Sequence, residues 1–546
     1  MIANQTGNSG EEICSRFAQL EGGRGNWESH WQEISERVLP SHSRTFMQQN
    51  MGSLDGDKRN TLMIDATASM ALDRFAAAME SMLTPRNQRW HGLRATLPEL
   101  NKVRAVRLWF DEVADILFRY RYANKANFAS QQHETYLMLG AFGTGAMFID
   151  QLDRRDGGGL RYKSIHLAEV FFCENHQGVI DTVFRKFPLT ARQALMQFGE
   201  DNPALPDTIK KGMDKNPEQE FWFLHHVCPR EDYDSERMDA KGMPYASSYV
   251  CLDNKMIVKE SGFQSFPYAV SRYVTAPGEI YGRSPAMTVL PNIKILNEQK
   301  KTLLKQGHRA VDPVLLAHDD GVMDTLSLKP GAINYGGVSA EGRALVHALP
   351  VGNLAVGKDM MDDERAIIND AFLVTMFQIL VDTPQMTATE VLERAREKGA
   401  LLSPTMGRQQ SELLGPMIER ELSLLRDQRL LPEMPGELIE AAGEYEIAYD
   451  SPLSRAQKAE DAAGLMRTAE FAVQVAVNTQ SPEPLDHFNW DTIIPELSDI
   501  NAVPARWMRG AQEIQAIRQG RQQQMAAQQM TQALPGIAAM TKAVQP

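Results

Sequence analysis

The segment from Thr387 to Arg420, TATEVLERAREKGALLSPTMGRQQSELLGPMIER, constrains the fold of this chain more than any other segment. Its start predicts a capping box, in which the Thr387 hydroxyl would accept from the Glu390 amide and the Glu390 side chain would reach back to the Thr387 amide. Pro404 interrupts a helical pattern of apolar residues. The pattern predicts a long, kinked, amphipathic helix with one buried face. The apolar positions are Ala388, Val391, Leu392 and Ala395 before the proline, and Leu413, Leu414, Met417, Ile418 and Leu422 after it.

Length and composition limit the class of protein. The chain has 546 residues, which predicts several domains rather than one core. Its formal net charge of -13 argues against a protein that coats nucleic acid by neutralising phosphates. The longest strongly apolar run, Ala371 to Val381, is too short to span a bilayer, so we expect no membrane partner. The four cysteines are widely spaced and are typical of free thiols in a reducing compartment.

The first half of the chain divides into a helical part and a β-rich part. Residues Glu11 to about Asn127 read as mostly helical. Short strand-like runs between Gly143 and Pro277 predict a β-rich subdomain, with one helix near Thr190 to Phe198. These runs are AMFID, RYKSIHL, VIDTVFRKF, EFWFLHHV and SYVCLD. In the helical part, one apolar face is predicted from Leu108, Trp109, Val113, Ile116, Leu117 and Tyr120.

The second half begins with two helices around a small β element. A cationic helix is predicted over Ser284 to Ala310, with Pro285 early in it and a kink or a later start at Pro291. Glycine-rich strand-like runs follow from Asp312 to Asn353. The second helix is predicted from Lys358 to Phe377. Its acidic start complements the positive end of a helix dipole. The acidic residues are Asp359, Asp362, Asp363 and Glu364.

The C-terminal part is predicted to be helical. A second capping box, Ser454 with Gln457, opens a helix that runs to about Val477. A proline-rich linker, SPEPLDHF, follows it. The last predicted helix, Ala505 to Ala533, is rich in glutamine and carries few charges.

Candidate reactive groups are few. His318, Asp319 and Asp320 could bind a metal, but no second ligand motif accompanies them, and a loop-surface role is favoured. The pair His225-His226 is interpreted as one buried and one exposed histidine of a strand. The glycines from Gly140 to Gly145 lack the GK[ST] ending of a phosphate loop and predict close packing at a helix-to-strand turn. Without a GxSxG or Walker motif, we expect neither an enzyme nor a cofactor.

Three further segments carry a resemblance. They are SMLTPRNQRWHGLR from Ser81, VIDTVFRKFPLTARQALMQFG with FLHHVCPR, and GEIYGRSPAMTVLPNIKILNEQKK from Gly278. With the Thr387–Arg420 helix, and in this order, they resemble the portal (head-to-tail connector) proteins of tailed phages, especially short-tailed podoviruses. His91 departs from that family's usual aromatic residue. The resemblance covers about the first four fifths of the chain and ends near Leu453.

The resemblance implies an α+β, mainly α, portal fold assembled as a ring. Its parts would be a wing over residues 1–283, stem helices over 284–310 and 358–377, and a β-containing clip over 311–357 between them. A tunnel loop would occupy 378–386, the long wing helix and a return strand 387–453, and a helical crown 454–546.

The resemblance also implies a function. A ring, usually a dodecamer in that family, would stand at one capsid vertex, where double-stranded DNA is packaged and ejected and where head joins tail. The implied partners are the terminase large subunit, a tail adaptor, the major capsid protein and a scaffold. The implied location is the virion, after assembly in the host cytoplasm.

The resemblance assigns roles to particular residues. The stem would line the DNA channel with Lys294, Lys300, Lys301 and Lys305. The same lysines also suit a solvated helix face, with Glu298 pairing Lys301 or Lys305. The tunnel loop would present Val381, Asp382, Thr383 and Pro384, although its length also suits a plain helix connection. The clip would present His318, Asp319, Asp320, Asn334 and Tyr335 to partners.

Two other classes remain open from the sequence. The first is a metal-dependent nucleic-acid or phosphoester hydrolase that uses His318, Asp319 and Asp320. The second is another ring-forming virion adaptor, although adaptors are usually much shorter and lack the helix–sheet–helix order followed by a long helix.

Overall fold

The computed structural model describes residues 10–42, 46, 60–152, 157–317, 326–375, 404–441, 443–449, 452–479, 483–500, 507–510 and 513–525. The chain divides into two compact units, neither of which is one continuous stretch of sequence. Unit 1 comprises Met1–Ser81 and Asn124–Leu424, and unit 2 comprises Met82–Ala123 and Leu425–Pro546. Helices and strands both contribute, so the chain belongs to the predicted α+β class. Within the described ranges, no helix is long and apolar enough to cross a lipid bilayer.

Unit 1 contains two antiparallel sheets that account for the predicted β-rich region. The three-stranded sheet has the order β3-β2-β9, and the five-stranded sheet has the order β4-β5-β6-β7-β8. The strands are β2 (Thr144–Gln151), β3 (Leu160–Ile165), β4 (Val170–Glu174), β5 (Ile180–Thr190), β6 (Glu220–Pro229), β7 (Tyr245–Cys251), β8 (Met256–Phe263) and β9 (Tyr268–Arg272).

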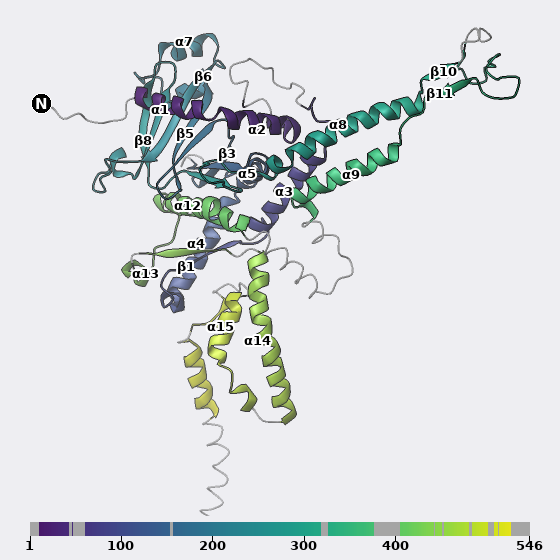
Figure 1. Cartoon of the computed structure of the whole chain (residues 1–546). Coiled ribbons are helices and arrows are strands. Elements are labelled where there is room, and N and C mark those ends of the chain that lie inside the picture. Colours follow the sequence, from purple (N-terminus) through teal and green to yellow (C-terminus); the bar gives the residue numbers. More distant parts are fainter. Residues whose placement is uncertain are drawn as a thin grey trace, which may run out of the picture. The chain divides into compact units, whose positions relative to one another are not determined.

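Both faces of the five-stranded sheet are covered. Helix α1 (Gly10–Gly23) lies across one face (Figure 1), where Phe17 packs with Phe184 and Leu224. On the other face, helices α6 (Ala191–Phe198) and α7 (Asp207–Lys215) pack on Phe187 and Phe223. Successive residues of β5 and β6 therefore enter opposite cores, as the period of two in a strand requires.

Because both faces of the sheet are covered, the prediction of one buried and one exposed histidine is wrong: His225 and His226 are both buried. His225 stacks on Tyr249, with ring centroids 4.1 Å apart, and its ring nitrogens bond the Tyr268 hydroxyl at 2.9 Å and the Ser247 hydroxyl at 3.0 Å. His226 faces the α1 side and stacks on Phe184 at 4.3 Å. An exposed histidine would need one open sheet face, and β6 has none.

The glycine-rich turn between α5 (Phe128–Phe142) and β2 is a packing device, as predicted. Gly143 ends the helix with φ +80°, and a Cβ there would lie 2.2 Å from the Gly282 carbonyl oxygen. A Cβ at Gly140 would lie 2.6 Å from a Leu72 methyl group. Only glycine permits both the left-handed backbone and the close approach of neighbouring chain.

Helices complete unit 1. The predicted helix near Thr190 is α6, and a capping box of Thr190 and Gln193 starts it. The others are α2 (Gly25–Arg37), α3 (Thr67–Leu83), which ends at the boundary with unit 2, α8 (Pro285–Val311) and α9 (Leu354–Ala371). Short 3-10 turns lie at Pro40–His42 and Ala240–Gly242.

The long helix predicted after Thr387 is described from residue 404 onward. It holds a π-helical turn, Gln410–Leu414, before α12 (Gly415–Asp427). Four of the predicted core positions, Leu413, Leu414, Met417 and Ile418, are buried. Leu422 is only partly buried, and Leu424 and Leu425 are buried instead. The capping box at Thr387 and Glu390 lies outside the described residues.

Unit 2 combines a short sheet with helices. Strand β1 (His91–Ala95) pairs antiparallel with β12 (Tyr445–Tyr449). Helix α4 (Arg104–Arg121) packs on it, and its buried face corrects the predicted one. That face consists of Val106, Phe110, Val113, Ala114, Leu117 and Arg121, so only Val113 and Leu117 were predicted. Its remaining elements are Leu100–Lys102 (a 3-10 turn), α13 (Gly436–Glu440), α14 (Pro452–Thr479), Glu483–Leu485 (a second 3-10 turn) and α15 (Trp490–Ile500). Of the last predicted helix, residues 513–525 are described and are helical.

Candidate functional site

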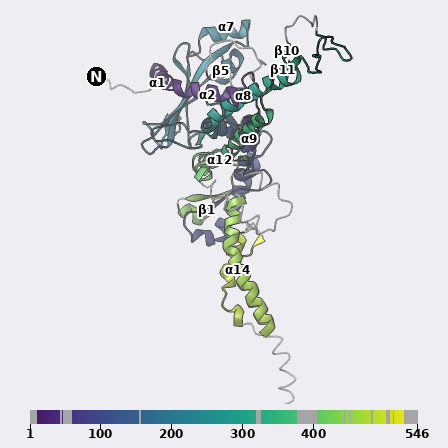
Figure 2. The same cartoon turned by 45° about the vertical axis from the view of Figure 1, so that its right-hand side comes forward.

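The candidate site is a hairpin of two helices that leaves the body of unit 1 (Figures 1 and 2). Helices α8 and α9 run side by side, and the strands β10 (Leu315–Ala317) and β11 (Val346–Ala348) pair antiparallel at their far end. The start of α8 is fixed by Ser284, whose hydroxyl accepts from the Met287 amide at 3.0 Å and donates to the Ala141 carbonyl at 2.7 Å. The helix starts at Pro285 and runs through Pro291, so a later start is excluded.

Helix α9 starts earlier than predicted. Asn353 caps it by accepting from the Ala355 amide at 2.9 Å, so the first turn contains no acidic residue. The prediction that acidic residues at the start of this helix complement its dipole is therefore wrong, because Asp359 and the acidic residues after it lie beyond the first turn. Glu364 instead accepts from the Asn292 side chain of α8 at 2.9 Å and so joins the two helices.

A buried carboxylate anchors the hairpin to the rest of unit 1. Asp65 precedes α3, and its side chain is 3% exposed. It accepts from the Lys300 ammonium of α8 at 3.1 Å and from the Arg365 guanidinium of α9 at 2.8 Å. Burial would raise the pKa of Asp65, but hydrogen bonds from Thr67, Arg365 and Lys300 outweigh it and hold the pKa well below its usual range.

A second contact supports the anchor. The Asn297 side-chain oxygen of α8 accepts from the Ile64 and Asp65 amides, each at 2.8 Å. Sequence reasoning missed both Asp65 and Asn297. Asp65 lies one residue before the N-cap of α3, and its carboxylate accepts from the Thr67 amide at 2.9 Å.

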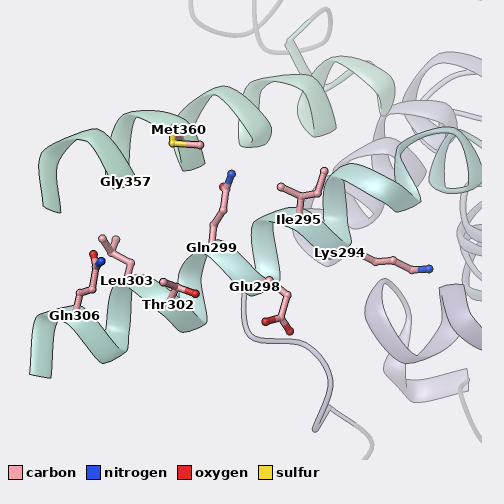
Figure 3. Close-up of a pocket in the computed structure, with 9 residues that line it drawn as sticks. All are labelled: Lys294, Ile295, Glu298, Gln299, Thr302, Leu303, Gln306, Gly357 and Met360. Atoms are coloured by element: carbon pink, nitrogen blue, oxygen red, sulfur yellow. The ribbon is translucent and has the colours of Figure 1, made fainter. Parts of the chain in front are cut away.

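The flank of the hairpin carries an apolar groove of about 550 Å³. Figure 3 shows its lining: side chains from three successive turns of α8, with Gly357 and Met360 of α9 opposite. Ile295 and Met360 are about half exposed, at 47% and 52%. The remaining lining residues are Lys294, Glu298, Gln299, Thr302, Leu303 and Gln306. A solvent-open groove lined by apolar side chains is a candidate surface for another molecule.

The four predicted stem lysines differ in their environments. Lys294 pairs with Glu33 at 2.5 Å, and Lys300 belongs to the Asp65 anchor. Lys301 pairs with Glu298 at 3.4 Å in the i,i+3 geometry, and Lys305 is exposed without an acidic partner among the described residues. Their role in a DNA channel stays a prediction.

Helix α9 carries the opposite charge. Its acidic residues Asp359, Asp362 and Asp363 are all exposed. Of these, Asp362 pairs within the helix with Arg365, at 2.8 Å. The two helices therefore differ in net charge: α8 exposes mainly cations, with Glu298 as an exposed acid, and α9 exposes mainly carboxylates, with Lys358 as an exposed cation.

The tip around β10 and β11 contains the predicted clip residues that the structure describes. Asn334 forms two hydrogen bonds with the Ser327 backbone, at 2.8 and 2.9 Å, and so closes a loop where a strand-like run was expected. Tyr335 is 84% exposed, and Ile333 and Leu328 are similarly open. The predicted residues His318, Asp319 and Asp320 lie outside the described residues, as do Val381, Asp382, Thr383 and Pro384. In the described ranges, no three Asp, Glu, His or Cys side chains converge as a metal ion would require.

An apolar groove, helices of different net charge and an exposed apolar tip are features of proteins that act by contact with other proteins. Comparison with known proteins identifies its family. The model of a family described as bacteriophage head to tail connecting protein matches residues 10–508. The chain belongs to this family and is a head-to-tail connector, a structural component of a phage virion.

Two relatives support this assignment. The chain is 30% identical over 527 residues to the portal protein of Salmonella phage epsilon15. It is 31% identical over 527 residues to a probable portal protein of Bordetella phage BPP-1. Each match covers 95% of this chain and 92% of the relative.

Proposed function

We propose that copies of this chain close into a ring, with twelve copies as in the family, around an open axis at one capsid vertex. Double-stranded DNA would enter and leave the head through that axis. The observation that carries this proposal is the α8–α9 hairpin, which is anchored by Asp65 and Asn297, exposes an apolar groove and separates its positive and negative charges. A helix pair of this kind buries its open flank when a second copy packs beside it.

The proposed division of the chain is the one that the resemblance to portal proteins implies. Helices α8 and α9 would be the stem, the module around β10 and β11 the clip, and residues 378–386 the tunnel loop. Residues 1–283 and 387–453 would form the wing, and residues 454–546 the crown. The exposed apolar tip suits the clip, because a partner's strands or side chains would cover it.

The charge pattern supports passage rather than tight binding of DNA. A net charge of -13 per copy repels the duplex, and a few exposed cations such as Lys301 and Lys305 would keep it on the axis. The terminase large subunit, a tail adaptor, the major capsid protein and a scaffold are the proposed partners. Assembly would take place in the host cytoplasm, and the chain would then remain in the virion.

The test of ring formation is direct. Purified chain is examined by electron microscopy and by mass photometry. We expect closed rings with a central opening, and particles with a filled centre would overturn the proposal.

The role in DNA transport needs a second test. The double variant K301Q/K305Q is compared with K211Q, which removes an exposed lysine of α7, in a packaging and retention assay. We expect rings in both, because glutamine removes the charge of α8 without adding repulsion between copies, and an altered DNA content only in the double variant. Equal DNA content in all three proteins would argue against stem cations acting on the duplex.

A further inference from the structure

A second cavity of unit 1, of about 740 Å³, lies between the facing surfaces of the two sheets. Its lining comes from β2 and β3 on one side, from β5, β6 and β7 on the other, and from the ends of α5 and α6. On the first side, Lys163 lies directly across from Phe148 in the strand register. On the second, Arg185, His225 and Tyr249 form one row across three strands.

The polar groups of this cavity are mainly hydrogen-bond donors. The side-chain oxygen of Gln131 already accepts from the Ser164 amide at 2.7 Å, and that of Gln193 accepts from the Thr190 amide at 3.1 Å. Each glutamine therefore keeps its NH₂ group for another acceptor. His225 is neutral, because burial and then the Arg185 guanidinium hold its pKa well below the usual range, and both of its ring nitrogens are already bonded.

The charged side chains that line the cavity carry a net charge of one positive unit. The lining holds Arg161, Lys163 and Arg185 against Asp150 and Glu169. Arg185 pairs with Glu169 at 3.0 Å, whereas Lys163 has no acidic partner within ion-pair distance among the described residues. Lys163 lies on the solvent-open side of the cavity and is exposed; partial burial of its side chain, followed by repulsion from Arg185, lowers its pKa. A bound anion beside the ammonium would remove that penalty.

We propose that this cavity binds one carboxylate group, with Lys163 as its counter-ion and the Gln131 and Gln193 amides as donors. A single negative charge matches the net charge of the lining, whereas Asp150 and Glu169 would repel a phosphate dianion. Phe148 and Phe187 supply apolar surface for the methylene groups that carry the carboxylate. The carboxylate can come from a glutamate side chain of a protein segment or from a small free organic acid. The site is independent of the ring proposed above.

The test uses N-acetyl-glutamate amide as a probe, since its side chain carries one carboxylate on a peptide-like stem. Saturation-transfer difference NMR on the full chain reports binding, and acetate is the small-acid arm. We expect the glutamate probe to bind, and K163Q to weaken its binding at least tenfold. An affinity ten times higher than that of acetate assigns the site to a protein side chain, and equal affinities assign it to a free acid.

Three controls decide the outcome. N-acetyl-glutamine amide has the same shape without the charge and is expected not to bind. K163R keeps the cation and should retain binding, and K211Q should bind as the unaltered protein does. Equal binding of the neutral probe, or binding by K163Q at the unaltered affinity, would overturn the proposal. Far-UV circular dichroism and the unfolding midpoint of K163Q separate lost binding from lost folding.

Discussion

At the scale of single residues, Asp65 has the most consequence for the hairpin. Its buried carboxylate accepts hydrogen bonds from two cationic groups, so D65N leaves Lys300 and Arg365 facing a neutral amide. Hydrogen bonds to charged groups contribute roughly 1.5–3 kcal/mol each. We expect D65N to lower the free energy of unfolding by roughly 2–3 kcal/mol, measured by urea titration at pH 7.

The matched control is D362N, which removes a carboxylate from the same Arg365 at an exposed position. Exposed ion pairs contribute less than about 1 kcal/mol, so a small effect is expected. The pKa of Asp65 is lower in the folded state than in the unfolded chain. Its stabilisation is therefore complete above the unfolded value, near 4, and lost only as the pH falls below it. Equal stabilities of D65N and D362N would show that the carboxylate does not anchor the helices.

The buried His226 predicts a dependence of stability on pH. Burial lowers the pKa of His226 to about 4, well below the value near 6.5 of an unfolded chain. As the pH falls, the unfolded chain takes up the proton first, which favours unfolding. We expect the unaltered protein to lose about 2 kcal/mol of stability between pH 7 and pH 5 through this group alone.

The variant H226F keeps an aromatic ring against Phe184 but cannot titrate. The difference in unfolding free energy between the two proteins, measured at pH 7 and at pH 5, isolates the contribution of His226. The control H176Q changes an exposed histidine and should leave that difference near zero. A pH-independent difference for H226F would contradict the argument.

At the scale of elements, two glycines with positive φ, Gly143 and Gly178, show two separate costs of replacing glycine by alanine. These are the cost of left-handed backbone and the cost of a collision with neighbouring atoms. Gly143 and Gly178 have φ values of +80° and +77°, but only at Gly143 would a Cβ collide with backbone. Left-handed backbone costs an alanine about 1–2 kcal/mol. We expect G178A to lose that amount, and G143A to lose about 3 kcal/mol or more because overpacking adds to it. Equal losses in thermal or urea unfolding would contradict the close packing.

The sequence predicts long, regular elements better than short, buried ones. The strand-like runs predicted β2, β3, β5, β6 and β7. Strand β9 (Tyr268–Arg272) was not predicted, because every residue in it is buried and its sequence shows no alternation. The face of α4 was misplaced because Leu108 and Trp109 are apolar yet only half buried. Helix α9 begins before the predicted Lys358 because Asn353 caps it, and this cap precedes the acidic residues on which the prediction rested.

The candidate site was predictable in outline only. The order of helix, small sheet and helix follows from glycine and apolar spacing in continuous sequence. The anchor does not, because Asn297 and the Asp65 amide lie 232 positions apart in the chain and meet only after folding. The sequence alone therefore does not distinguish Lys300, which contacts Asp65, from the other stem lysines.

At the scale of the whole molecule, the separation of charge on the hairpin predicts how copies associate. In the proposed ring, contacts would be heterologous, so one face of each copy would meet a different face of the next. With α8 cationic and α9 acidic, the facing helices of neighbouring copies would attract each other. We expect K301E/K305E to reduce the ring fraction at least tenfold in mass photometry, and D359K/D363K to do the same, because like charges then face each other.

The decisive variant combines all four changes. Each copy then presents an acidic α8 to the cationic α9 of its neighbour. The two helices attract each other again, with the charges exchanged between them, and rings should re-form. High salt should also partly rescue the two double variants, because about 1 M salt screens charges beyond roughly 3 Å, but it should not improve the quadruple variant. If the quadruple variant assembles no better than either parent at low salt, α8 and α9 of adjacent copies do not face each other. The apolar groove would then have to be covered by some other surface of the next copy.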